Sequence, residues 1–168
     1  FRSGANRTER SRYLAAYSRN VFAEDVRKEF ESIRLTLPLR NSLAAKQKTM
    51  TDALRRYQQI MEYEVREFTT QSLFHVGSIY AQLSRDLMAS DRPKGLDELE
   101  LEQYEILLEE QAYPFEESAI EVFETNVQHG WNGSYDEWVA KSIAALAKLM
   151  PGRYNKQEAQ EEFSDVIY

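Results

Sequence analysis

The sequence contains no cysteine, which excludes disulfide bonds, thiolate metal sites and cysteine nucleophiles. Glycine and proline are scarce, with 6 and 4 copies among 168 residues, and no alternating β pattern lies between turn signals. No apolar run approaches the roughly 20 residues that span a bilayer, and no signal peptide is visible in this stretch. Phosphate-binding glycine loops and the Gly-x-Ser-x-Gly motif are also missing. The sequence therefore offers no recognisable catalytic signature.

The composition is rich in Ala, Leu, Glu, Gln and Arg, which are strong helix formers. The length of 168 residues is sufficient for one domain with a hydrophobic core. We therefore predict an all-α fold, a helical bundle or solenoid-like array, in a single domain over residues 1–168. Because the first residue is Phe rather than Met, we expect this domain to be a fragment of a longer chain.

One apolar stripe predicts a very long central helix over residues 42–90. Proline is absent between Leu39 and Arg92, and the stripe has a period of about 3.7 residues, which favours a straight helix over a left-handed coiled coil. Such a helix would be about 70 Å long and must be covered by other helices or by a partner. Its members recur at steps of three and four residues, with Ser72 in one polar slot: Met50, Leu54, Tyr57, Met61, Val65, Phe68, Val76, Ile79, Leu83 and Leu87.

An acidic helix that contains Pro114 is predicted over residues 96–129, after a turn at residues 91–95. Its apolar pattern continues in phase across Pro114, so we predict a kinked helix. The alternative is two helices, the second of which begins at Pro114. The expected buried stripe is Leu99, Leu101, Tyr104, Leu107, Leu108, Ala112, Phe115, Ala119, Val122, Phe123, Asn126 and Val127.

At the N-terminal side a helix is predicted over residues 7–19, and it either continues or breaks near Asn20 into a second, amphipathic stretch over residues 23–35. The dipeptide Leu37-Pro38 should close the second of them, because the residue before a proline avoids the helical region. Asn41 or Ser42 should then cap the long helix.

The C-terminal side begins with Gly130, which we expect to end the acidic helix in a left-handed conformation. Ser134 and Glu137 match a capping box that starts a further helix, and that helix should end at residues 150–152. Residues 156–168 form either a final helix or the beginning of a continuing segment. The aromatic residues of this region are expected to pack the corner rather than to form a binding hot spot: Trp131, Tyr135 and Trp138.

The net charge of −7 is unevenly distributed. Residues 1–56 hold 13 Lys and Arg against 6 Asp and Glu, whereas residues 57–168 hold 8 against 22. Residues 97–124 contain eleven carboxylates and neither Lys nor Arg. This asymmetry argues against nucleic-acid binding by the whole chain, which needs a continuous basic surface. It predicts that the acidic helix lies near the basic N-terminal helices or near a basic partner, unless it is only a solvated face.

Four positions have the spacing of the first-helix signature of a tetratricopeptide repeat: Leu73, Val76, Gly77 and Tyr80. Ala89 lies where the second helix of that repeat has an Ala, but Pro93 leaves no room for a second helix of normal length. Residues 104–117, 133–139 and 149–154 together resemble the C-terminal region of large tetratricopeptide-rich proteins of the Gram-negative envelope. The resemblance covers residues 100–156. It implies a periplasmic helical scaffold associated with an envelope machine of the Tol, Ton or motility type, and it implies no catalytic residues.

Neither histidine has the spacing of a helical metal site. Di-iron bundles use Glu-x-x-His pairs, but Ser72 lies three residues before His75 and Asn126 three before His129. No EF-hand calcium loop is present. We therefore predict no metal and no cofactor, a hydrogen-bonded structural role for His75, and a helix-end position for His129. An enzyme remains an alternative, and it would require an inward-facing His75 with a carboxylate partner.

Taken together, these patterns predict a non-enzymatic module for protein–protein interaction within a larger scaffold. We expect no nucleic-acid ligand and no membrane span in this fragment. The alternative is a structural homo-oligomer built on the long helix. The partner would have a basic surface and would bind in a groove where the long helix meets the acidic helix, at Tyr104, Glu109, Glu110, Tyr113, Phe115, Glu116 and Glu117.

Overall fold

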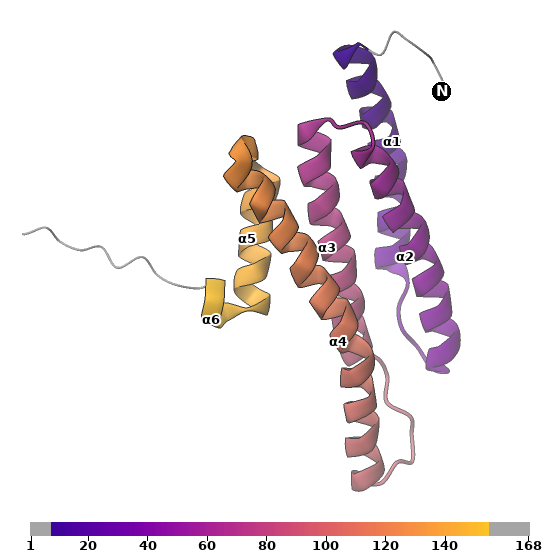
Figure 1. The fold of residues 1–168 in the computed structure, drawn as a ribbon. Helices are drawn as coiled ribbons and strands as arrows, with labels where there is room; N and C mark the ends of the chain where they lie inside the picture. Colours follow the sequence, from indigo (N-terminus) through magenta and orange to yellow (C-terminus); the bar gives the residue numbers. More distant parts are fainter. Residues whose placement is uncertain (1–7, 155–168) are drawn as a thin grey trace, which may run out of the picture.

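The computed structural model describes residues 8–154, and this range is all-α, with six helices that pack against one another (Figure 1). Successive long helices run up and down the molecule, so that neighbours along the chain are antiparallel. The helix expected as an alternative over residues 156–168 lies outside the described range. The elements are α1 (Glu9–Ser32), α2 (Leu39–Met61), α3 (Arg66–Met88), α4 (Glu98–His129), a π-helical turn (Gly130–Ser134), α5 (Glu137–Leu149) and α6 (Pro151–Tyr154).

The single long helix expected over residues 42–90 is wrong, because the chain reverses at residues 62–65 and forms α2 and α3. Glu64 adopts a left-handed backbone with φ of 54° at this reversal. Its amide donates to Met61 O at 2.9 Å and so closes the end of α2. The apolar stripe is thereby folded onto itself: Tyr57 and Ile60 of α2 share one core with Ile79 and other residues of α3. The stripe needs no external partner along most of its length.

α1 is one continuous helix, so of the two alternatives for residues 7–35 the unbroken helix is confirmed. Thr8 caps it, because the Thr8 side chain accepts from the Ser11 amide at 3.2 Å. The helix ends at Ser32, several residues before Leu37-Pro38. Ser42 does not cap α2 in the expected way; its hydroxyl binds the backbone of Thr36 in the preceding loop.

Lys46 lies on α2 and contacts both the end of α1 and α3. Its side chain is fully buried, and Nζ donates to Phe30 O at 3.0 Å and to Ile33 O at 2.7 Å. Nζ also lies 2.7 Å from a carboxylate oxygen of Asp86 on α3. A cation at the C-terminal end of α1 satisfies carbonyl groups that lack helical partners and complements the helix dipole.

α3 is the central helix, because it contributes to both apolar cores. One core joins it to α1 and α2, and the other joins it to α4 and α5. α3 and α4 approach closely at Gly77, where an added Cβ would lie 2.7 Å from the Phe123 ring. The absence of a side chain at Gly77 therefore allows the Phe123 ring to pack directly on the α3 backbone.

α4 continues through Pro114 as one helix, as the in-phase stripe predicts. Figure 1 shows its axis changing direction near the middle of its length. Asp97 and Glu100 form a capping box at its start, after the expected turn, in which Gly95 has a φ of 87°. α4 packs mainly against α3 and α5, so the expectation that it lies beside the basic N-terminal helices is not met.

The corner between α4 and α5 differs from its expected form. Gly130 is helical, with φ of −60°, and the left-handed residue is Gly133, with φ of 88°. Asp136 rather than Ser134 caps α5, because its carboxylate accepts from the amides of Trp138 and Val139. The end of α5 at Met150 is as expected.

The aromatic residues of this corner do not all pack inside it. Trp131 and Tyr135 are exposed, whereas Trp138 packs between Phe74 and Lys141. Among the described residues, no helix combines the length and the apolar character that a bilayer crossing requires.

Glu64 provides a test of the reversal. Replacing Glu64 with Gly should raise the free energy of unfolding by about 1 kcal/mol, because glycine adopts a positive φ without the clash of a Cβ. Urea denaturation of both proteins measures the difference. Glu62→Gly is the matched control, and it should lower stability, because Glu62 has a helical φ of −62°. Equal effects of the two substitutions would contradict the left-handed assignment.

Lys46 provides a second test. Lys46→Met preserves the apolar stem but removes the charge, so two carbonyl groups and Asp86 lose their cationic partner. We expect the free energy of unfolding, measured by urea denaturation, to fall by about 2 kcal/mol. This value allows for the partial exposure of Asp86, which weakens the ion pair. Lys48→Met, two residues away and exposed, should change stability by less than about 0.5 kcal/mol. Similar losses for both variants would show that Nζ contributes nothing specific.

Candidate functional site

The seven residues expected to bind a partner lie on two different sides of α4. Glu109, Glu110, Tyr113 and Glu117 are exposed, whereas the other three are partly buried: Tyr104, Phe115 and Glu116. Phe115 packs against the core that α1, α2 and α3 share. The space where α3 meets α4 is therefore occupied by core side chains, and the exposed members belong to the opposite, outer face of α4.

That outer face carries a row of large apolar side chains in the N-terminal half of α4. Leu99, Ile106 and Tyr113 are 62%, 50% and 60% exposed, and they recur every seven residues. Seven residues are two helical turns, so the three lie on one face. Carboxylates flank the row on both sides, at Glu102, Glu109 and Glu110. We call the row and these flanking carboxylates the α4 stripe.

The sequence-based assignment of this region was partly wrong, because Leu99, Leu101 and Leu107 were placed in the buried stripe and are exposed. The true buried residues of α4 include Leu108, Ala112 and Ala119. The separate seven-residue recurrence of Leu99, Ile106 and Tyr113 is the signal that could have shown a second apolar face.

Tyr113 is held in place on this surface by a local contact. Its hydroxyl donates to Glu117 Oε1 at 2.6 Å, one turn further along α4. This hydrogen bond requires the phenol proton, and it raises the pKa of Tyr113. The ring therefore stays neutral and is fixed on the exposed face, where it can serve as an aromatic anchor.

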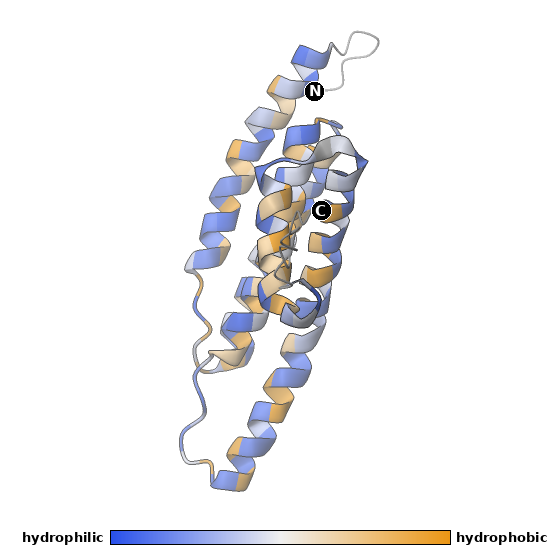
Figure 2. Ribbon diagram, turned by 90° about the vertical axis from the view of Figure 1, so that its left-hand side faces the viewer, coloured by the Kyte–Doolittle hydropathy of each residue, from blue (hydrophilic) through white to orange (hydrophobic). Residues whose placement is uncertain are grey.

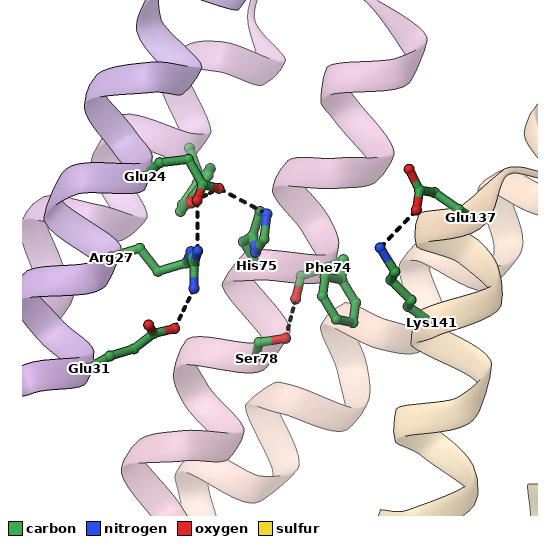
Figure 3. A network of polar contacts seen from close by, with 9 residues as sticks. Glu24, Arg27, Glu31, Phe74, His75, Ser78, Glu137 and Lys141 are labelled. Atoms are coloured by element: carbon green, nitrogen blue, oxygen red, sulfur yellow. Dashed lines mark hydrogen bonds and ion pairs between the residues drawn. The ribbon is translucent and has the colours of Figure 1, made fainter.

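His75 faces inward and has a carboxylate neighbour, which is the arrangement required by the enzyme alternative. It stacks on Tyr57 of α2 and packs against Trp138 of α5, with ring centroids 5.4 and 5.2 Å apart. Nε2 lies 3.1 Å from Glu24 Oε1 of α1 (Figure 3), but it forms no hydrogen bond. Arg27 also binds Glu24, at 2.6 Å.

The electrostatics of this cluster do not favour acid–base catalysis. Burial lowers the pKa of His75 to about 4, although the nearby Glu24 carboxylate opposes the shift. Burial alone would raise the pKa of Glu24, but Arg27 and His75 lower it below its usual value. The imidazole is thus neutral and the carboxylate charged at pH 7. A general base works best with a pKa near the working pH, which His75 lacks.

The cluster joins four helices, because Glu24 and Arg27 lie on α1, Tyr57 on α2, His75 on α3 and Trp138 on α5. Ser78, a hydroxyl near His75 in Figure 3, donates to Phe74 O at 2.8 Å. These contacts favour a structural role for His75. Among residues 8–154, no three His, Asp or Glu side chains converge as metal ligands would.

A second feature is a groove of about 330 Å³ between α3 and α5. Phe74, Ala81 and Phe123 contribute apolar surface, whereas cationic residues lie along the sides: Arg85, Lys141 and Lys148. Lys141 is already engaged, because it pairs with Glu137 at 2.8 Å and lies over the Trp138 ring. Apolar surface flanked by cations would fit a ligand group that is apolar and negatively charged.

The chain matches no known family model, and neither curated proteins nor solved structures yield a match. The resemblance to tetratricopeptide-rich envelope proteins therefore stays a prediction. Evidence on function comes from the surface of the molecule itself.

The buried His75 predicts a specific pH dependence of stability. Its pKa is lower in the folded than in the unfolded chain, so the unfolded chain binds the proton first as the pH falls. Between about pH 6.5 and pH 4 the free energy of unfolding should fall by about 3 kcal/mol. Urea denaturation across this range measures the slope, to which Glu24 adds a further loss below about pH 4.5, because its pKa is lowered in the folded chain.

The stability of the variant His75→Gln should be nearly independent of pH from about pH 6.5 to pH 5, where the carboxylates are still ionised, because the substitution removes the titrating imidazole. His129→Gln, which changes the exposed histidine at the end of α4, should keep the wild-type slope. If His75→Gln keeps that slope as well, the titration of His75 does not govern stability.

Proposed function

We propose that this chain is a non-enzymatic protein-interaction module whose α4 stripe binds a basic, amphipathic segment of a partner protein. The observation that carries the proposal is the exposed row of Leu99, Ile106 and Tyr113 between carboxylates. Large apolar side chains on a charged helix are costly to expose unless something covers them. Figure 1 places this half of α4 beyond the rest of the bundle, where a partner can reach it.

Charge and apolar contact would act together at this surface. The apolar row supplies the free energy of burial, with Tyr113 as the aromatic anchor. The carboxylates select a basic partner and accelerate its association, an effect that weakens with salt. Residues 97–124 hold neither Lys nor Arg, so no cation from this segment itself neutralises the carboxylates of the α4 stripe.

The wider setting follows from the resemblance described above. We propose that the module belongs to a larger tetratricopeptide-like scaffold of the periplasm, within an envelope machine of the Tol, Ton or motility type. The helical hairpins of α1–α2 and α3–α4 are compatible with such a scaffold. This part of the proposal rests on the resemblance, whereas the α4 stripe rests on the structure.

The interaction proposal predicts binding of a synthetic amphipathic helix. A fluorescent 18-residue peptide with Leu at helical spacing and Lys on its flanks should bind the full chain in an anisotropy titration. Ile106→Ser with Tyr113→Ser should weaken binding at least about tenfold, because the apolar row is lost. Reversing Glu109 and Glu110 to Lys should weaken it similarly and reduce its salt dependence.

Two controls identify the surface. A peptide with Glu in place of Lys should bind poorly, and Trp131→Ser, which removes another exposed aromatic, should leave binding unchanged. Equal affinity of the wild type and the Ile106/Tyr113 variant for the Lys peptide would rule out the α4 stripe as the binding surface.

A further inference from the structure

α1 carries a second exposed apolar row. Leu14 and Val21 are 55% and 46% exposed, and Tyr17 between them is also exposed. Arg10 and Lys28 extend this row at the same helical spacing. We call these five residues the α1 stripe. Its ends are basic, whereas the α4 stripe is flanked by carboxylates.

The two stripes have matching spacing over equal lengths. In each, positions on one helical face follow one another at alternating steps of four and three residues. The positions on α1 are Arg10, Leu14, Tyr17, Val21, Glu24 and Lys28, of which Tyr17 and Glu24 lie toward the bundle, Tyr17 against Phe68 and Glu24 beside His75. The positions on α4 are Leu99, Gln103, Ile106, Glu110, Tyr113 and Glu117.

The stripes cannot cover each other within one molecule. Figure 1 shows the start of α1 rising above the bundle at one end and the start of α4 extending below it at the other. Figure 2 shows hydrophobic residues interspersed with hydrophilic ones on both protruding ends. Among residues 8–154, no other helix extends as far as either protruding end.

Stacking of two copies along the long axis brings the two ends together. α1 runs from its free end into the bundle, and α4 runs from the opposite free end into the bundle. If one copy is placed below another in the same orientation, the α1 end of the lower copy lies beside the α4 end of the upper copy. The two helices are then antiparallel.

We propose that the α1 stripe of one copy packs antiparallel on the α4 stripe of a second copy, so that the chain assembles head to tail. In the register that aligns the stripes, Leu14 faces Tyr113 and Val21 faces Ile106. Arg10 faces Glu117, so opposite charges meet at one end. This inference rests on the proposed function, since it names the basic partner of the α4 stripe as α1 of another copy.

A contact between two different surfaces does not close on itself after two copies. Unless a rotation between copies closes a ring, it continues as an open chain of molecules. A symmetric dimer would instead use the same surface twice. The two arrangements differ in the behaviour of mixed variants, which gives a sharp test.

The test is sedimentation or light scattering of the full chain over a tenfold range of concentration, up to about 1 mM. The average mass of the wild type should rise steadily above the 19.7 kDa of one copy, and less so at high salt. Leu14→Ser with Val21→Ser, and separately Ile106→Ser with Tyr113→Ser, should each yield a monomer. Circular dichroism should show unchanged helix content, because all four side chains are exposed.

An equimolar mixture of the two variants should form a dimer of twice 19.7 kDa and nothing larger, because each contributes one intact stripe. Trp131→Ser should assemble like the wild type. A monomeric wild type, or a mixture that stays monomeric, would overturn the head-to-tail contact. Binding of the Lys peptide by a monomeric wild type would leave the α4 stripe intact as a site for a different protein.

Discussion

The packing of α2 against α3 is the contact on which the rest of the molecule depends. The reversal at residues 62–65 turns one continuous apolar stripe into two facing halves, which bury Tyr57 and Ile60 with Ile79. α3 then has a second side for α4, where the Phe123 ring rests on Gly77. α1 and α5 cover the remaining sides. The two protruding ends of the bundle, at the starts of α1 and α4, extend beyond this packing.

Polar groups inside the bundle fix how the helices are placed. Lys46 ties the end of α1 to Asp86 of α3, and Glu24 ties α1 to His75. Asn126 is fully buried on α4, and its amide donates to Thr70 O and Ser142 Oγ of the adjacent helices. Apolar packing alone tolerates small shifts between helices, whereas buried hydrogen bonds and ion pairs are lost when the helices shift. The same burial that makes the His75 cluster structural makes it sensitive to acid.

The surface complements this interior. The bundle keeps its acidic helix away from its basic N-terminal segment, so the charge asymmetry of the sequence becomes a separation in space. The start of α4 combines exposed apolar side chains with carboxylates alone, whereas the α1 stripe has a cation at each end. Such surfaces suit association that is selective, because burial supplies affinity and charge excludes partners of the same sign. The proposed binding of a basic segment and the proposed head-to-tail contact use this one property.

The sequence by itself determined the all-α fold, the turn at residues 91–95, the continuity of α4 across Pro114 and the end of α5, because helical periodicity, Gly and Pro act locally. Only the tertiary structure decided the reversal at Glu64, where neither Gly nor Pro marks a turn. It also decided that Asp136 rather than Ser134 caps α5, and that Leu99 and Leu107 are exposed while Phe115 is partly buried against the core. Periodicity shows which residues share a face, but what covers that face depends on segments distant in the chain. For the same reason no sequence spacing could pair Glu24 with His75.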